Sequence, residues 1–103
     1  MSAGDEAYWE IGQMLGCTMS EDDYDDFEDE KQAVASWISE IELDGCTRLL
    51  GEVGRLFANT STALERREHF PPGLGFLEAD GSNFDPLMDH VELLLRDRIA
   101  RES

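Results

Sequence analysis

The stretch "DPLMDHVELLLRDRI", from Asp85 to Ile99, carries the clearest helical pattern in the chain. Its apolar residues recur at spacings of three and four, which places them on one face of a helix. Asp85 is of a residue type that caps helix N-termini, and Pro86 suits the first helical position. The arginines near the far end suit the negative end of the helix dipole. These residues are Leu87, Met88, Val91, Leu94, Leu95 and Ile99 on the apolar face, and Arg96, Arg98 and Arg101 at the end.

Three segments that precede it in the chain show the same period, and each predicts an amphipathic helix. Gly16 follows the first segment directly and is predicted to end that helix as its C-cap. Gly45, Gly51 and Gly54 lie in or near the third segment, where they either let a neighbouring helix approach or end the helix early. The apolar residues are Ala7, Tyr8, Ile11, Met14 and Leu15; Val34, Trp37, Ile38 and Ile41; and Cys46, Leu49, Leu50, Val53, Leu56 and Phe57.

Between the third and last helices, the sequence predicts one short helix and one loop. The helix runs from Ser61 to about His69, since Thr62 and Glu65 are spaced as a capping box. Residues 70–84 contain two prolines, three glycines and an Asp-Gly pair, which predict turns with a short extended piece at Leu74–Leu77. No segment shows sustained two-residue alternation. The predicted fold is therefore all-α, a single domain over residues 1–103 with four or five amphipathic helices around one core.

The charge of the chain is strongly negative and unevenly distributed. There are 24 acidic and 8 basic residues, for a formal net charge of -16. The first fifty residues hold 14 acidic and 2 basic residues, and the remainder hold 10 and 6. Such a charge argues against binding nucleic acid or an anionic membrane surface, because both repel it. It favours a basic protein partner.

Cysteine usage and the N-terminal residues indicate a compartment. Cys17 and Cys46 form no CxxC pattern, and small secreted domains usually carry more cysteines than two. Two buried free thiols are therefore favoured over a disulfide. The first ten residues, "MSAGDEAYWE", lack the features of a signal peptide, and no apolar run reaches the roughly 20 residues of a membrane span. A cytoplasmic protein is expected.

The sequence offers little for catalysis, metal binding or cofactor binding. His69 and His90 are the two histidines, and neither belongs to a recognisable Ser-His-Asp or Cys-His arrangement. The glycines of "GLG" at residues 73–75 lack the spacing of a phosphate-binding loop. An EF-hand register that starts at Asp23 places Phe27 and Val34 where ligands belong. We therefore expect no enzyme, no cofactor and no metal site.

An acidic run precedes the second predicted helix. Of the ten residues from Glu21 to Glu30, eight are carboxylates and two are aromatic. The last three carboxylates suit the helix dipole, but the earlier ones repel one another. Aromatic rings among charges are typical of binding surfaces, although a solvated surface segment is the alternative, and Phe27 equally suits a core contact. The candidate partner-binding residues are Glu21, Asp22, Asp23, Tyr24, Asp25, Asp26 and Phe27.

Four segments together resemble the small helical immunity proteins of bacterial contact-dependent growth inhibition systems. They are "MLGCTMSEDDYDDF" (Met14 to Phe27), "EKQAVASWI" (Glu30 to Ile38), "LLGEVGRLF" (Leu49 to Phe57) and "LGFLEADGSNFDPLMDHVELLLRDRI" (Leu74 to Ile99). One group of that family has a leucine-glycine step, an aromatic-acidic segment and three helices in this order. Its aromatic-acidic segment often reads "YFHQDW", and this chain lacks the first aromatics and the histidine.

The resemblance implies a function that agrees with the charge. Such proteins bind the C-terminal toxin domain of a neighbouring cell's surface protein and block it, and many of those toxins are nucleases. The resemblance carries over only the general location of Asp22, Asp23 and Tyr24. An acidic regulator or nucleic-acid mimic that inhibits another basic nucleic-acid-binding protein is the alternative function.

Overall fold

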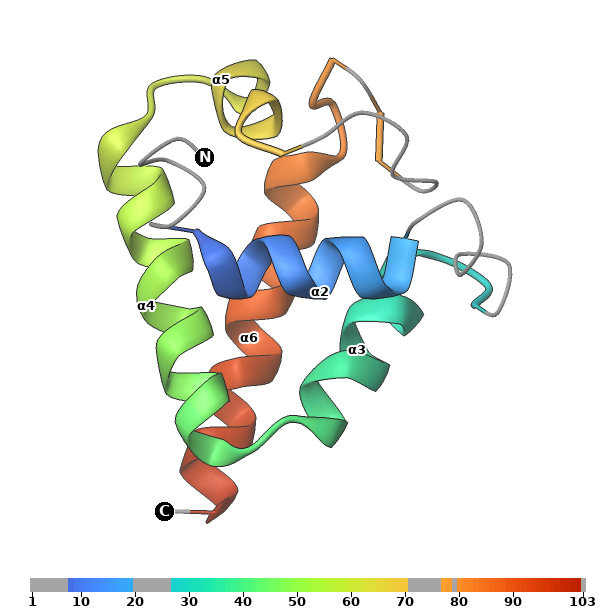
Figure 1. Cartoon of the computed structure of the whole chain (residues 1–103), viewed down its shortest axis with the longest axis vertical. Coiled ribbons are helices and arrows are strands. Elements are labelled where there is room, and N and C mark those ends of the chain that lie inside the picture. Colours follow the sequence, from blue (N-terminus) through green and yellow to red (C-terminus); the bar gives the residue numbers. More distant parts are fainter. Residues whose placement is uncertain (1–7, 20–26, 71–76, 79, 103) are drawn as a thin grey trace.

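The computed structural model describes residues 8–19, 27–70, 77–78 and 80–102, and its helices carry the labels of Figure 1. All regular secondary structure in these residues is helical, which confirms the all-α class. Helices α4 and α6 lie side by side and run in opposite directions, while α2 crosses in front of α6 (Figure 1). The helices are α2 (Trp9–Met19), α3 (Glu30–Glu40), α4 (Leu43–Asn59), α5 (Ala63–Glu68) and α6 (Phe84–Glu102).

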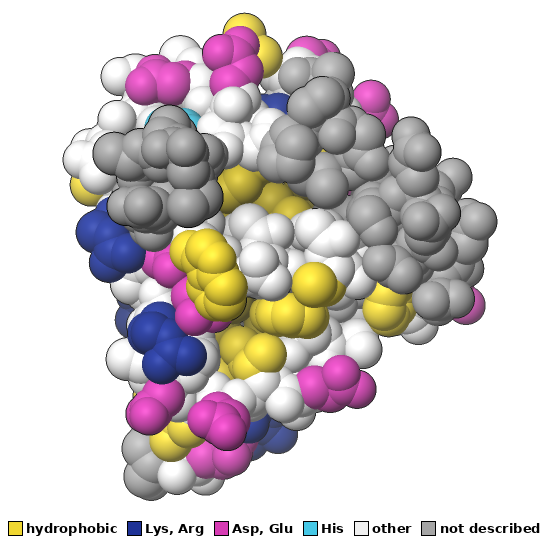
Figure 2. Space-filling view, viewed as in Figure 1, with side chains coloured by type: hydrophobic (Ala, Val, Ile, Leu, Met, Phe, Trp, Pro, Cys, Tyr) yellow, Lys and Arg dark blue, Asp and Glu magenta, His cyan; other side chains and the backbone are white. Residues whose placement is uncertain are grey.

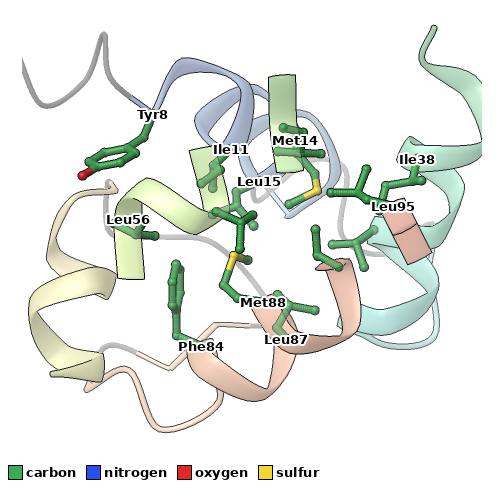
Figure 3. Packing of buried hydrophobic residues seen from close by; sticks show 14 of the residues in the cluster. Tyr8, Ile11, Met14, Leu15, Ile38, Leu56, Phe84, Leu87, Met88 and Leu95 are labelled. Atoms are coloured by element: carbon green, nitrogen blue, oxygen red, sulfur yellow. The ribbon is translucent and has the colours of Figure 1, made fainter. Parts of the chain in front are cut away.

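One cluster of buried apolar side chains joins the helices. Ile11 and Leu15 of α2 lie in this cluster with Met88 of α6, as Figure 3 shows. The rings of Phe70 and Phe84 stack with their centroids 5.7 Å apart. The apolar stripe predicted for α6 therefore faces the core at its most buried positions. Those positions are Leu87, Met88, Val91 and Leu95, joined by Phe84.

Two aromatic side chains that the sequence places in the core are only partly buried. Trp37 and Phe57 pack against the edge of the cluster. The indole Nε1 of Trp37 is buried and has no hydrogen-bond partner. Both side chains therefore lie between the core and the surface, where part of each ring contacts apolar side chains of the cluster.

Helix α2 does not end at Gly16, so that prediction was wrong. The helix continues to Met19, and Gly16 is an exposed residue within it. Thr18 explains the continuation, since its side chain is 4% exposed and its Oγ1 donates to the carbonyl oxygen of Met14 at 2.6 Å. Only a helical backbone brings Thr18 back over the preceding turn.

The glycines of α4 do not break the helix, which runs through all three positions. Gly51 and Gly54 are exposed, and a Cβ at Gly54 would meet no atom within 4 Å. Gly45 is buried, and a Cβ there would lie 3.6 Å from the side chain of Ile41. The chain that joins α3 to α4 therefore packs closely against the first turn of α4.

The capping box predicted before α5 is present. The side chain of Thr62 accepts a hydrogen bond from the backbone N–H of Glu65 at 3.1 Å, and Glu65 Oε2 accepts from the N–H of Ser61 at 3.2 Å. The predicted Asp-Gly turn also occurs, since Asp80 accepts from the N–H of Ser82. Gly81 has φ 79°, and a Cβ there would lie 2.7 Å from the carbonyl oxygen of Ala63. Glycine is therefore required at this turn.

Asp85 is not the N-cap of α6, because the helix begins one residue earlier, at Phe84. The Asp85 carboxylate instead accepts two hydrogen bonds from the guanidinium of Arg66, at 2.6 and 2.7 Å. Arg66 also donates to Thr60 Oγ1 and lies 4.4 Å from the centroid of the Phe57 ring. Asp85 therefore ties α6 to the ends of α4 and α5.

Arg67, next to Arg66, is 4% exposed. It donates to the carbonyl oxygens of Glu78 and Phe70, both at 3.2 Å. Burial lowers the pKa of its guanidinium. Both acceptors in these two contacts are backbone carbonyl oxygens. Arg67 therefore holds the segment after α5 against that helix.

Arg98 joins α6 to α3 and also pairs with a carboxylate at the end of its own helix. Its Nη1 donates to the carbonyl oxygen of Ile38 near the end of α3, and its Nε donates to Glu102 at 2.6 Å. The last carbonyl groups of a helix lack partners within that helix, so a cation placed there is favourable. The arginine cluster at the end of α6 therefore serves a neighbouring helix as well as its own.

Both cysteines are free, as expected, but only one is buried. Cys46 lies in the core, whereas Cys17 is exposed on α2. The expectation that both thiols are buried was wrong for Cys17. Burial raises the pKa of the Cys46 thiol. Among the described residues, no helix is both long enough and apolar enough to cross a lipid bilayer.

Candidate partner-binding surface

The entry into α3 follows the acidic run, and its geometry is well defined. Asp29 is the N-cap, and its side chain accepts a hydrogen bond from the backbone N–H of Gln32 at 2.8 Å. In return, Gln32 Oε1 accepts from the N–H of Glu28 at 2.6 Å. The first bond satisfies a donor that the start of the helix leaves unpaired, and the second holds the residue before the N-cap against the first turn. Glu30 lies in the first turn, so the prediction that the last acidic residues serve this helix is confirmed.

Of the predicted partner-binding residues, only Phe27 belongs to the described part of the chain. It is half-buried and packs against the apolar core. Glu21, Asp22, Asp23, Tyr24, Asp25 and Asp26 lie outside the described residues, so their role in binding stays a prediction. Phe27 makes the core contact that was one of its two expected roles, and part of its surface remains open to solvent.

Outside the acidic run, the described surface also has an excess of negative charge. Seven of the 24 acidic residues lie outside the described residues, which leaves 17 within them, whereas all 8 basic residues are described. Exposed carboxylates occur at the junction of α3 and α4, on α5 and on α6. They include Glu40, Glu42, Asp44, Glu68, Asp89 and Asp97.

Most of the basic side chains are already engaged with groups of the same chain. Among the described residues, five of the eight form ion pairs with carboxylates, and Arg67 is buried against carbonyl groups. The acidic partners are Glu10, Asp85, Glu92, Glu102 and Asp97. The cations are thus held close to carboxylates, and the remaining carboxylates dominate the potential around the described surface.

A buried carboxylate, which the sequence reading missed, fixes the start of α2. Glu52 of α4 is 6% exposed. Its two carboxylate oxygens accept hydrogen bonds from the backbone N–H groups of Glu10 at 3.1 Å and Ile11 at 3.0 Å. The side chain of Glu10 in turn accepts from Arg48 Nε at 3.0 Å. A signal for Glu52 was present, because it lies three residues after Leu49, within the apolar stripe of α4.

The environment of Glu52 has opposing effects on its acidity. Burial raises the pKa of its carboxyl group, and the two backbone N–H bonds and the charge of Arg55 lower it. The negative charge of Glu10 acts in the same direction as burial. The net result is a pKa above the ordinary value of 4.5. The folded protein therefore binds this proton more tightly than the unfolded chain does.

We expect the stability contributed by Glu52 to increase as the pH falls. When folding raises the pKa of a group, the group stabilises the fold fully at a pH below its pKa in the unfolded chain. This contribution disappears as the pH rises through the pKa of the group in the folded protein. The difference in unfolding free energy between the wild type and Glu52→Gln should therefore shift in favour of the wild type as the pH falls from neutral toward 4.5. Urea unfolding at several pH values measures it. A shift in the opposite direction would contradict the raised pKa.

A contiguous arc of residues runs from the end of α3, along α4, to the start of α2. We call Ile41, Gly45, Arg48, Glu10 and Trp9 the front arc. A Cβ at Gly45 would lie 3.6 Å from Ile41 and 3.8 Å from Arg48 Nη2, and Arg48 is paired with Glu10. Hydrophobic side chains gather on the face shown in Figure 2, below α2 and between α4 and α3. The Trp9 side chain, at the first position of α2, is 54% exposed.

An open depression lies beside His69 on the described surface. Glu65, Glu68 and His69 line this depression, which has a volume of about 200 Å³. The His69 ring packs against the Tyr8 ring, with centroids 5.1 Å apart and the planes at 74°. Within residues 8–19, 27–70, 77–78 and 80–102, no group of three or more His, Cys, Asp or Glu side chains is placed to hold a metal ion. His69 therefore has a packing role.

Comparisons with protein-family models, with curated proteins and with solved structures gave no match to this chain.

Proposed function

We propose that this chain is an immunity protein that binds and neutralises the toxin domain of a contact-dependent growth inhibition system, with a nuclease as the expected toxin. The observation that supports the proposal is the surface charge. The net charge is -16, and at least five of the eight basic side chains form ion pairs with described carboxylates of the same chain. Such a surface attracts a basic protein and repels nucleic acid.

The proposed mechanism is competition for the toxin's cationic surface. A nuclease must present lysine and arginine side chains to a phosphate backbone. The carboxylates of this chain occupy those side chains, and the opposite potentials accelerate encounter by about 10- to 1000-fold at low salt. Aromatic side chains that become buried on binding slow dissociation. Binding is stoichiometric, and the chain itself catalyses nothing.

The gene neighbourhood and a titration test the proposal. We expect the gene for a large toxin to lie directly upstream of the gene for this chain. The C-terminal domain of that toxin should be basic. An equimolar amount of this chain should abolish the activity of that domain, and unrelated basic nucleases should remain active. Full toxin activity at equimolar inhibitor would refute the proposal. Comparable, strongly salt-sensitive binding to several basic proteins would favour the alternative, a general nucleic-acid mimic.

Charge reversal in the acidic run is predicted to slow association with the toxin domain. In the variant Asp22→Lys, Asp23→Lys, Asp25→Lys and Asp26→Lys, we expect the association rate at low salt to fall about tenfold or more. Helicity should not change, because the helices that the structure describes include none of these positions. Stopped-flow mixing with the domain encoded upstream measures the rate, and far-UV circular dichroism measures helicity.

A matched variant separates the position of the charge from its amount. Lysine at the exposed positions Glu68, Glu78, Asp89 and Asp97 changes the net charge equally. Its association rate should fall much less, since these residues lie on α5, on α6 and before α6. Equal losses in the two variants would show that the acidic run acts only through the total charge.

A further inference from the structure

The front arc has an exposed aromatic side chain that the fold does not use. Trp9 is 54% exposed and is absent from the cluster of core side chains. Its position follows from the register of α2, because Tyr8, Ile11, Met14 and Leu15 take the buried positions and turn Trp9 outward. A tryptophan is among the side chains that contribute most when a protein interface buries them.

Exposed carboxylates border the arc at the junction of α3 and α4. Glu40, Glu42 and Asp44 are all exposed, and none belongs to the five ion pairs of the described residues. Arg48, the cation within the arc, is already paired with Glu10. Glu42 and Asp44 also interact electrostatically with Arg48, so this one exposed cation is shared by two border carboxylates besides Glu10. The border therefore keeps an excess of negative charge next to Trp9 and Ile41, and charged residues around apolar contacts are typical of protein interfaces.

This charge restricts what can cover the surface. A second copy of this chain would bring a further net charge of -16, so self-association here is electrostatically opposed. Nucleic acid and anionic lipid are repelled for the same reason. Charge complementarity leaves a basic protein as the occupant, with lysine or arginine side chains beside apolar ones in its contacting element.

We propose that the front arc, with its border of Glu40, Glu42 and Asp44, is a second contact surface for the basic toxin domain, separate from the acidic run. This inference rests on the proposed function, since it assigns a further surface to the same partner. An arginine or lysine of the partner lies over the Trp9 indole in a cation–π contact. Neighbouring cations meet the three border carboxylates, and an apolar side chain contacts Ile41.

Two variants and their matched controls test the surface with the toxin domain encoded upstream as the probe. Trp9→Ala should raise the dissociation constant about tenfold or more, as expected for a tryptophan anchor. Its control, Leu93→Ala, removes a side chain that is 66% exposed on α6 and should have little effect. The variant Glu40→Gln, Glu42→Gln, Asp44→Asn should weaken binding several-fold more than Glu68→Gln, Glu78→Gln, Asp89→Asn. Isothermal titration calorimetry at about 0.15 M salt measures all four.

The indole N–H signals in NMR spectra of the ¹⁵N-labelled wild type give an independent test. Trp9 is exposed and Trp37 Nε1 is buried, so the two signals report the surface and the fold separately. We expect the Trp9 signal to shift on addition of the unlabelled toxin domain. If the wild type binds while both variants keep its affinity and the Trp9 signal stays unmoved, this surface is refuted and the proposed function stands. Absence of wild-type binding would refute both.

Discussion

Phe84→Ala is expected to lower the free energy of unfolding by about 3–5 kcal/mol, the range for removing a buried aromatic side chain. Phe84 is fully buried at the start of α6 and stacks on Phe70. The helix that it begins packs against α3, α4 and α5. Alanine would therefore leave a cavity where several helices meet. Urea unfolding followed by circular dichroism measures the loss.

Leu93→Ala is the matched control for this variant, because it truncates an apolar side chain of the same helix. Leu93 is 66% exposed, so its replacement should change the unfolding free energy by no more than about 0.5 kcal/mol. Similar losses for the two variants would mean that Phe84 is not at the centre of the core. A loss below about 1 kcal/mol for Phe84→Ala would contradict the stacking described above.

Glu52→Ala is expected to cost about 2–3 kcal/mol at neutral pH, because it leaves two backbone N–H groups of α2 without their acceptor. Of the two, the N–H of Ile11 is buried. Burial raises the pKa of Glu52, so the ionised carboxylate itself is costly, and this cost offsets part of the gain from the two hydrogen bonds. Urea unfolding gives the net effect.

Glu68→Ala provides the comparison, since it removes a carboxylate of the same size from an exposed position on α5. It should change stability by no more than about 0.5 kcal/mol. Glu52→Gln should recover part of the loss, because the amide oxygen remains an acceptor for one N–H group. If Glu52→Ala were as stable as Glu68→Ala, the carboxylate would not be needed to hold α2 on α4.

The helical class and the buried faces follow from local patterns. The spacing of Leu87, Met88, Val91 and Leu95 places these side chains on the inner face of α6, and all four are buried. The capping box at Thr62 and Glu65 is equally local, since both partners lie within one helical turn. Features of this kind are predictable because sequence neighbours determine them.

Features that depend on contacts between distant residues could not be predicted in the same way. The glycine at position 16 is compatible with a helix end, but the fold buries Thr18 beyond it, and the helix continues to Met19. Asp85 has the right type for an N-cap, but Arg66 binds its carboxylate across 19 residues. In both cases tertiary contacts outweigh a weaker local preference.

The candidate binding surfaces also include one feature that the sequence predicts and one that depends on the fold. The negative charge of the surface is visible in the composition, and the excess carboxylates of the described surface agree with it. The front arc was not predicted, because its members come from α2, from α4 and from the C-cap of α3, whose arrangement only the fold defines. Trp9 offered one signal, since it falls outside the apolar stripe of its own helix, where an aromatic residue has no packing role.

The central position of α6 also has a consequence for how the chain is synthesised. This helix follows the other described helices in the sequence, yet it packs against α3, α4 and α5. As the ribosome adds residues in order, the earlier helices emerge without the surface that covers their apolar faces. A nascent chain that stops before Phe84 therefore exposes these faces to chaperones, proteases and other nascent chains, and acquires its native core only after α6 has left the exit tunnel.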